Sequence, residues 1–441
     1  RSTSAGEAQI RTVELNNNGG IIQVDSGTLS LIGFGDKNFM GGTYVVSSGA
    51  VLEWDTSVIA SGLLMGTIEG DLNWKNTLSV PDSAVLNFTG GGNFNWINGA
   101  LNGGGTLTNQ SILNLTTTSS KSIQENTTMN NSGTINIADT GDLRIQNGSI
   151  LNNVVSGVID LQTDGGNIVG SGGGSNILNN TGIIKRTITT GEAKIDVELN
   201  NSGTIEVETG ELEIGNTQPF TNAINGIIKG VGVFDLPIAA NYTNDGVFAP
   251  GASPGTLSIQ GDFKSTTNSI LDIELNGLTQ GTEYDLLAIT GNADFEGSIQ
   301  ITLGFNPDVN DEFIIATTTN TINTCNLPPA VISSFGGLNY EFGVVCRNNN
   351  ELVLTVANET LGIDSINENE STVRLYPNPA SDIVSFSDIT IKKITVFDIN
   401  GKEMLSDSSN YISVKTLSNG IYIVKGTNDN GFSISKKLIK N

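Results

Sequence analysis

A short motif returns along the chain at nearly even spacing, and this repeat limits the folds that the chain can adopt. The clearest copies begin at Leu15, Met129 and Leu199, where an apolar residue is followed by asparagines and a glycine. Weaker copies begin at Leu151, Leu178, Phe220 and Tyr242. From Met129 onward, successive copies start 21 to 27 residues apart. A period of this length is typical of solenoids, in which each repeat forms one coil.

Within each repeat, apolar and polar residues alternate over two short runs. Around the copy at Leu199, the alternating residues are Ile205, Glu206, Val207 and Glu208, followed by Glu211, Leu212, Glu213 and Ile214. Alternation with a period of two predicts half-buried β-strands. Such a unit cannot bury its own apolar face, but coils stacked about 4.8 Å apart would pair every strand with its neighbours. We therefore predict an all-β protein with a right-handed parallel β-solenoid (β-helix) over residues 1–248, in coils of about 22 residues.

The asparagines and glycines fit the corners of such coils. Glycine and asparagine accept positive φ values at low cost, and both are poor helix formers. The chain contains 54 glycines. Asparagines that recur at one corner are expected to stack into ladders of side-chain hydrogen bonds.

Three tryptophans also follow the repeat. Trp54, Trp74 and Trp96 are spaced 20 and 22 residues apart. Two interpretations stay open at this point: an exposed aromatic strip that binds sugar rings, or a stack inside successive coils.

Composition excludes several classes of function. The 441 residues include no histidine, which excludes Ser-His-Asp and Cys-His catalysis and imidazole metal sites. The net charge of −24 argues against a nucleic-acid partner. No apolar run approaches the roughly 18–20 residues of a membrane-spanning helix, so we predict no membrane span. Because the chain starts at Arg1 and not at Met, we expect any signal peptide to have been removed or to lie outside this segment.

The spacing changes from Ala249 onward. Apolar strand-like runs from there to residue 357 are similar to the last coils of autotransporter-type bacterial surface proteins, and we predict terminal coils and a cap over residues 249–357. Cys325 and Cys346 lie 21 positions apart in this segment. They form either a disulfide, which needs an oxidising compartment, or two unrelated buried thiols. Tyr284 and Asp285 are a tempting pair for a site, but their repeat-like setting favours a packed structural role.

The end of the chain has a different composition. We predict a polar linker at residues 358–371 and a separate module at residues 372–441. Residues 371–441 carry 9 basic and 6 acidic side chains, whereas the rest of the chain is strongly acidic. Short alternating runs, with the hairpin signal Asn400-Gly401, predict seven strands in a small immunoglobulin-like β-sandwich.

This module resembles the type A C-terminal sorting domain of the Bacteroidota type IX secretion system (Por secretion system). The resemblance rests on three blocks: a Tyr-Pro-Asn-Pro opening, an Asp-x-x-Gly-Lys hairpin, and a Gly-Ile-Tyr strand with a Lys-Lys-Leu close. The signature residues are Tyr376, Pro377, Asn378, Pro379, Asp398, Gly401, Lys402, Gly420, Ile421, Tyr422, Lys436 and Lys437. The resemblance implies export through the periplasm to the outer-membrane surface or the extracellular space. It also implies recognition by the translocon and cleavage by a sortase-like peptidase.

The remaining residues give weak signals of chemistry. The densest acidic cluster comprises Asp196, Glu198, Glu206, Glu208, Glu211 and Glu213. Strand alternation places Glu206 and Glu208 on one outer face and Glu211 and Glu213 on another. Such faces are usually solvated; Ca²⁺ binding is a weak alternative, because no Asp-x-Asp-x-Asp loop is present. We predict no other cofactor, and no catalytic, cofactor-binding or metal-binding residue.

Three functional hypotheses follow. The first is a secreted or cell-surface adhesin-like repeat protein, not an enzyme, that contacts a glycan or a host or neighbouring cell surface. The second is a β-helix polysaccharide lyase or glycoside hydrolase, which would need carboxylates and basic residues converging in a groove. The third is a structural spacer of a longer surface protein. The sequence does not identify the ligand or the oligomeric state.

Overall fold

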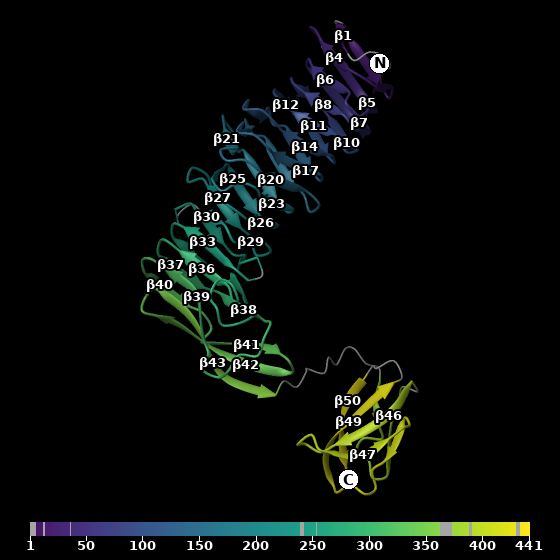
Figure 1. Ribbon diagram of the computed structural model, residues 1–441, viewed down its shortest axis with the longest axis vertical. Coiled ribbons are helices and arrows are strands. Elements are labelled where there is room, and N and C mark those ends of the chain that lie inside the picture. The colour runs from purple at the N-terminus through teal and green to yellow at the C-terminus, as the bar shows by residue number, and fades with distance from the viewer. Residues whose placement is uncertain are drawn as a thin grey trace. The chain divides into compact units, whose positions relative to one another are not determined.

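The computed structural model describes residues 6–11, 14–35, 37–238, 242–252, 254–361, 373–387, 390–428 and 433–441. The chain forms two compact units, residues 1–362 and residues 363–441, which are considered separately below. Within the described ranges every regular element is a β-strand (Figure 1). The first unit is the parallel β-solenoid that the repeat predicts, and its strands stack coil on coil from the N-terminal end.

Three faces run along the solenoid. The first face is a sheet of fourteen parallel strands, one from each successive coil. In order, they are β1 (Glu7–Arg11), β4 (Thr28–Ile32), β6 (Val51–Asp55), β8 (Asp71–Trp74), β11 (Asn93–Trp96), β14 (Ile112–Leu115), β17 (Thr134–Ile137), β20 (Val158–Leu161), β23 (Ile183–Arg186), β26 (Thr204–Val207), β29 (Ile227–Gly230), β32 (Val247–Pro250), β35 (Ile270–Leu275) and β38 (Ser298–Leu303).

The second face follows the same stacking order. Its strands are β2 (Leu15–Asn18), β5 (Lys37–Val46), β7 (Val58–Ile68), β9 (Leu78–Ser79), β12 (Ala100–Asn102), β15 (Lys121–Ile123), β18 (Leu143–Gln146), β21 (Ile168–Ser171), β24 (Glu192–Asp196), β27 (Glu211–Ile214), β30 (Val233–Asp235), β33 (Thr256–Gln260), β36 (Leu286–Ile289) and β39 (Glu312–Thr318).

The third face is continuous with the second, because the long strands β5 and β7 pair with strands of both faces. Besides the C-terminal halves of β5 and β7, it contains β3 (Ile21–Val24), β10 (Ser83–Thr89), β13 (Thr106–Asn109), β16 (Thr128–Asn131), β19 (Ile150–Asn153), β22 (Ile177–Asn180), β25 (Glu198–Asn201), β28 (Phe220–Asn222) and β31 (Tyr242–Asn244). A separate small sheet holds β34 (Phe263–Lys264), β37 (Ala293–Glu296) and β40 (Ile322–Asn326).

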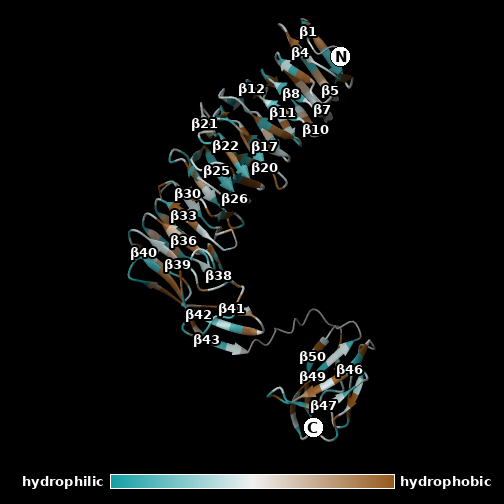
Figure 2. Cartoon of the chain, viewed as in Figure 1, coloured by the Kyte–Doolittle hydropathy of each residue, from teal (hydrophilic) through white to brown (hydrophobic). Residues whose placement is uncertain are grey.

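Alternation along each strand builds the core. In Figure 2, hydrophobic and hydrophilic residues follow one another along the strands. The buried apolar side chains form one continuous cluster through the solenoid. The three tryptophans belong to this core. Trp54, Trp74 and Trp96 occupy the same register position, and each is at most 1% exposed. The Trp74 and Trp96 rings stack with centroids 4.0 Å apart, so the tryptophans form an internal stack and not a sugar-binding strip.

A buried row of asparagines begins soon after the tryptophan stack ends. We call it the inner amide row; its members are Asn109, Asn131, Asn153, Asn180, Asn201, Asn222 and Asn244, all at most 2% exposed. Each side-chain Nδ2 donates to Oδ1 of the asparagine one coil further on, over 2.7–2.9 Å. A buried amide needs such partners, because an unsatisfied one is costly. The ladder expected from the repeat is therefore present.

The glycines of the motif make room for this row. A Cβ atom added to Gly182 would lie 2.9 Å from Asn153 Nδ2, and one added to Gly226 would lie 2.2 Å from Asn222 Oδ1. Both positions also press against backbone carbonyls of neighbouring coils. At these two corners the motif pairs a buried asparagine with a glycine because no larger residue fits.

Three cationic side chains are buried in the coils: Lys37, Lys121 and Arg186, each 0% exposed. Arg186 occupies the register position of Leu161 and Val207, where the pattern calls for an apolar residue. Its guanidinium donates to the carbonyl oxygens of Leu161, Thr163 and Gly191 at 2.8–3.1 Å, and also contacts Asp164. Arg186 therefore ties two corner loops of adjacent coils together.

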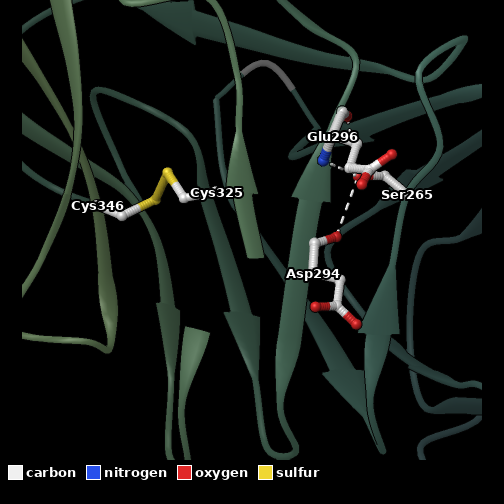
Figure 3. The surroundings of a disulfide bond; sticks show 5 residues. All are labelled: Ser265, Asp294, Glu296, Cys325 and Cys346. Carbon is white, nitrogen blue, oxygen red and sulfur yellow. Dashed lines mark hydrogen bonds between the residues drawn. A yellow bond between two sulfur atoms is a disulfide. The ribbon is translucent and has the colours of Figure 1, made fainter. Parts of the chain in front are cut away.

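An antiparallel segment closes the far end of the solenoid. Strands β41 (Ala330–Phe335), β42 (Leu338–Arg347) and β43 (Glu351–Leu361) pair in sequence, and β43 pairs back onto β39. Cys325 of β40 and Cys346 of β42 form a disulfide, which settles the two alternatives for the cysteines (Figure 3). Nearby, Ser265 Oγ donates to the carbonyl oxygens of Asp294 and Glu296. Hydrogen bonds and a covalent bond thus anchor the small sheet and the cap.

The second compact unit contains seven strands in two antiparallel sheets. One sheet has the order β44 (Leu375–Tyr376), β45 (Ile383–Phe386), β48 (Tyr411–Ser413). The other has the order β47 (Glu403–Asp407), β46 (Ile391–Phe397), β49 (Gly420–Asn428), β50 (Ser433–Lys440). Apolar residues of both sheets form one core, as expected of a small β-sandwich. Of the predicted linker, residues 358–361 belong to β43 and residues 362–371 lie outside the described ranges.

Candidate functional site

The Tyr-Pro-Asn-Pro block of the second unit is fixed to the last strand. Asn378 Nδ2 donates to the Lys437 carbonyl oxygen (2.7 Å), and Asn378 Oδ1 accepts from the Ile439 backbone N–H (2.9 Å). The peptide bonds before Pro377 and Pro379 are both cis. Tyr376 is 53% exposed. The amide of Asn378 thus acts as a strand partner for β50, while Tyr376 stays accessible.

The Asp-x-x-Gly-Lys block forms the hairpin between β46 and β47. Asp398 Oδ1 accepts from the backbone N–H groups of Asn400 and Lys402, both at 2.9 Å. Gly401 has a φ of 77°, in the left-handed region that favours glycine. The aspartate and the glycine of this block are therefore explained by the turn itself.

The third block lies on β49 and β50, which pair antiparallel. Gly420 starts β49, and Tyr422 is 8% exposed with its hydroxyl donating to the Ser418 carbonyl oxygen (2.9 Å). Ile421 is 49% exposed on the opposite face of the strand. Lys436 and Lys437 lie opposite Val424 and Ile423 in the β49–β50 register. The first and third signature blocks thus meet at the last strand, whereas the Asp-x-x-Gly-Lys block lies in the hairpin between β46 and β47.

The acidic residues of the solenoid divide between faces as alternation predicts. Glu206 lies on the first face and is paired with Lys229 Nζ (2.9 Å), and Glu208 directly follows this strand. Glu211 and Glu213 lie on the second face, opposite Glu192 and Lys194 of the preceding coil. Asp196 ends β24 of the second face, and Glu198 begins β25 of the third.

On the second face, carboxylates of three successive coils come together. Glu213 Oε1 lies 2.7 Å from Lys194 Nζ, and Asp235 is the next residue in the same register column. Burial, followed by the charges of Glu211 and Glu213, raises the pKa of Asp235 to about 6. A hydrogen bond with Glu213, followed by burial, raises the pKa of Glu192. This cluster therefore holds a proton more tightly than isolated carboxylates do.

Tyr284 and Asp285 are packed side chains. They are 5% and 2% exposed, and the Tyr284 ring packs edge-on against Phe313. Asp285 accepts one backbone N–H on each carboxylate oxygen, from Gly255 and from Glu274, at 2.8 Å. Burial raises the pKa of Asp285 to about 6 despite these bonds. The two residues anchor the chain between coils.

The third face carries a half-buried, outward-facing counterpart of the inner amide row, which the sequence analysis did not separate from it. We call it the outer amide row: Asn130, Asn152, Asn179 and Asn200, each adjacent in sequence to a member of the inner row. Here Nδ2 of each asparagine donates to Oδ1 of the asparagine one coil earlier, over 2.9–3.1 Å. The Asn-Asn pair in each repeat was the available signal, because adjacent strand residues face opposite sides.

An open groove of about 380 Å³ lies beside the C-terminal part of this row. Its lining residues are Asn179, Asn180, Thr181, Asn200, Asn201, Ser202, Thr221 and Ala223. In the parts of the chain that the structure describes, no group of three or more His, Cys, Asp or Glu side chains is placed to hold a metal ion. The same ranges contain no helix with the length and apolarity that crossing a membrane requires.

Comparison with known proteins identifies only the second unit. Residues 374–441 match the family model described as "Secretion system C-terminal sorting domain". None of the curated proteins matches the chain. The matched range contains all three signature blocks and both sheets of the second unit. The chain therefore carries a type IX sorting domain, which implies handling by the type IX secretion machinery and export to the cell surface or the extracellular space.

Proposed function

We propose that this chain is an adhesin-like extracellular rod that binds a glycan or another cell's surface through many weak contacts. The observation that carries the proposal is the repetition of the outer faces. The first face alone presents fourteen parallel strands, so equivalent outward positions recur at every coil. Repeated weak contacts along a stiff scaffold give avidity without a deep pocket. This function needs no catalytic residue and no cofactor.

The sorting domain supports the extracellular or cell-surface location that this proposed function requires. We propose that a Bacteroidota translocon recognises residues 374–441, and that a sortase-like peptidase then removes them as the rod is anchored or released. In this proposal the exposed Tyr376, together with Lys436 and Lys437, takes part in the recognition by the translocon. A chain that ends at residue 372 should accumulate in the periplasm, whereas the full chain should reach the surface or the medium, as measured by cell fractionation and immunoblotting.

The binding proposal is tested with the full chain on a glycan array, with and without Ca²⁺. The same spots are followed for several hours for release of small sugars. Saturable binding without product is the expected result. Binding that requires Ca²⁺ would add a cation to the site. If the chain binds no glycan on the array and no whole cells, the proposal is overturned in favour of a structural spacer.

A second candidate, a glycoside hydrolase or polysaccharide lyase, is favoured by the carboxylate cluster of the second face. An acid whose pKa is raised, as at Asp235, is suited to protonate a leaving group, while Glu213, in the same register column, would serve as the base. In the array experiment this function would appear as loss of polymer and release of sugars. The variant Asp235→Asn would then abolish product while retaining binding.

A further inference from the structure

The two amide rows differ in how many of their hydrogen-bonding groups the protein itself uses. A carboxamide has two N–H donors and an oxygen with two lone pairs. In the inner row, one N–H of Asn131, Asn153 and Asn180 continues the row. Backbone carbonyl oxygens of the same or neighbouring coils accept a second bond from these amides, over 3.0–3.1 Å. Both N–H donors of these inner-row amides are therefore used within the fold.

The outer row is only half used. Asn152 donates one N–H to Asn130 and accepts one from Asn179, and Asn179 donates to Asn152 and accepts from Asn200. Among the described residues, no other protein group bonds these two side chains. Each therefore presents one N–H and one oxygen lone pair outward, and successive coils repeat this pair at the coil spacing of about 4.8 Å.

The strands around the row are uncharged up to Glu198, which lies on the same side of β25 as Asn200. Strands β10, β13, β16, β19 and β22 contain no Asp, Glu, Lys or Arg, and Glu198 of β25 is the first charged residue of the face beyond them. The second face of the same coils carries Arg144, Lys194 and Glu213. On a chain of net charge −24, a stretch of five successive strands without charge is distinctive. The stretch favours uncharged ligands, since the protein's overall field repels polyanions and Glu198, at its end, is the single carboxylate on the strands that carry the row.

The groove beside the row has a mainly apolar lining, in which three residues carry hydroxyl groups. Thr181 and Ser202 Oγ atoms donate to carbonyl oxygens of the preceding coil, at 3.2 and 3.4 Å, and line the groove together with Thr221. Their oxygens keep lone pairs that can accept hydrogen bonds. Amides and hydroxyls in one row match the hydroxyl groups of sugars, which both donate and accept.

We propose that the outer amide row and its groove bind a neutral polysaccharide that runs along the solenoid axis, with about one sugar residue per coil. The advance of an extended polysaccharide per sugar is comparable to the coil spacing of about 4.8 Å. Repetition over several coils multiplies contacts that are weak singly. This inference rests on the proposed glycan-binding function and assigns it a face and a ligand class.

The test compares two triple variants of the full chain. Asn152→Ala/Asn179→Ala/Asn200→Ala removes the outer row. The matched control, Asn95→Ala/Asn114→Ala/Asn136→Ala, removes outward asparagines of the first face, where Asn136 donates to Asn114 across coils in the same way. Binding is measured to immobilised β-1,4-glucan, β-1,3-glucan and mannan, with polygalacturonate as the anionic probe.

We expect wild-type protein to bind at least one neutral polysaccharide, the outer-row variant to lose about tenfold in affinity, and the control to stay within about twofold. Thermal melting confirms that each variant is folded. If the outer-row variant is unfolded, Ile150→Lys gives a second test, because it places a long charged chain on this face and leaves every amide intact.

The outcomes separate the inference from the function on which it rests. Equal binding by wild type and outer-row variants, or binding to polygalacturonate alone, would overturn the assignment of this face while leaving a glycan-binding rod. If the wild-type chain binds no polysaccharide and no cells, the proposed function fails, and the assignment fails with it.

Discussion

The solenoid holds its coils together in two different ways. In the N-terminal coils, residues 37–96, the interior contains Phe39, Tyr44, Trp54, Phe88 and Phe94 in edge-to-face contact, beside the stacked Trp74 and Trp96. In the coils of residues 109–244, the inner amide row runs through the same wall. A single register column links the two regions, since Leu64 aligns with Leu86 and Leu86 aligns with Asn109.

Where this register column changes from leucine to asparagine, apolar packing is replaced by a hydrogen bond that needs one particular partner. Apolar side chains pack against many neighbours, whereas each amide must meet the amide of the next coil or stay unsatisfied in a dry interior. The amide coils therefore fix the register between coils, and the aromatic coils gain their stability from buried area. Perturbations should affect the two regions differently.

The largest effect is expected in the aromatic region. Trp96→Ala removes the ring stacked on Trp74 and leaves a cavity, at a cost of about 4 kcal/mol in the free energy of unfolding. Denaturant unfolding followed by far-UV circular dichroism measures this cost. Ile112→Ala is the control, because Ile112 is 60% exposed and its loss should change stability by less than about 0.5 kcal/mol. Similar costs for the two variants would contradict the model of the aromatic core.

The cap contains a disulfide in addition to apolar packing, and it should be sensitive to reduction. Replacing Cys325 and Cys346 with serine opens a loop whose closure is worth about 3 kcal/mol in the chain-entropy model. Hydrogen exchange should then increase in β41–β43 and leave the tryptophan coils protected. Uniform loosening of the whole solenoid would show that the cap is not an independent source of stability.

Within the amide row, position should matter. Asn180→Leu leaves both Asn153 Nδ2 and Asn201 Oδ1 without their partner, at an expected cost of about 2.5 kcal/mol. Asn109→Leu should cost less, about 1.5 kcal/mol, because it breaks only one bond of the row, to Asn131, although the Ser111 backbone N–H also loses its acceptor. Thermal and denaturant unfolding measure both. Equal costs would mean that the row stabilises by packing alone.

The smallest effect is a dependence on pH that the amide region should show and the aromatic region should not. The folded-state pKa of Asp235 is raised to about 6 from an ordinary value of 3.8, so the folded state binds the proton more tightly. Stability should therefore fall as pH rises through roughly 4 to 6, and Asp235→Asn should flatten this slope. All three tryptophans of the chain lie in the aromatic coils, so their fluorescence should change little over this pH range. Hydrogen exchange in β27–β33, around Asp235, should follow the pH dependence.

The coils could be predicted because the sequence itself repeats with the period of the coils. The repeat at Leu199 predicted the strands, the faces of Glu206 and Glu213, and the asparagine ladder. It did not choose between the two interpretations of Trp74, since a spacing of 20–22 residues aligns side chains without saying which way they point. That choice depends on strand phase, which the short alternating runs left uncertain near the tryptophans.

Other features needed the coordinates. Arg186 breaks the apolar pattern at a core position, and only alignment of the copies would have marked it as buried. The adjacent residues Asn200 and Asn201 were a signal for two separate amide rows, because neighbouring strand residues face opposite sides. The asparagines were assigned to corners in the sequence analysis, and the two rows were therefore not separated. The sorting domain was recognisable from its blocks, whereas the joining of Asn378 to β50 was not, because 61 residues separate Asn378 from Ile439.

The directions of the two amide rows have an electrostatic consequence. In the inner row every N–H points toward later coils, and in the outer row every N–H points toward earlier coils. Each row is a line of aligned dipoles in which neighbours polarise one another. Because the two lines run antiparallel on the same strands, their fields along the axis oppose each other. The outer row therefore cancels part of the axial dipole of the longer inner row. The net axial dipole of the two rows is smaller than that of the inner row alone.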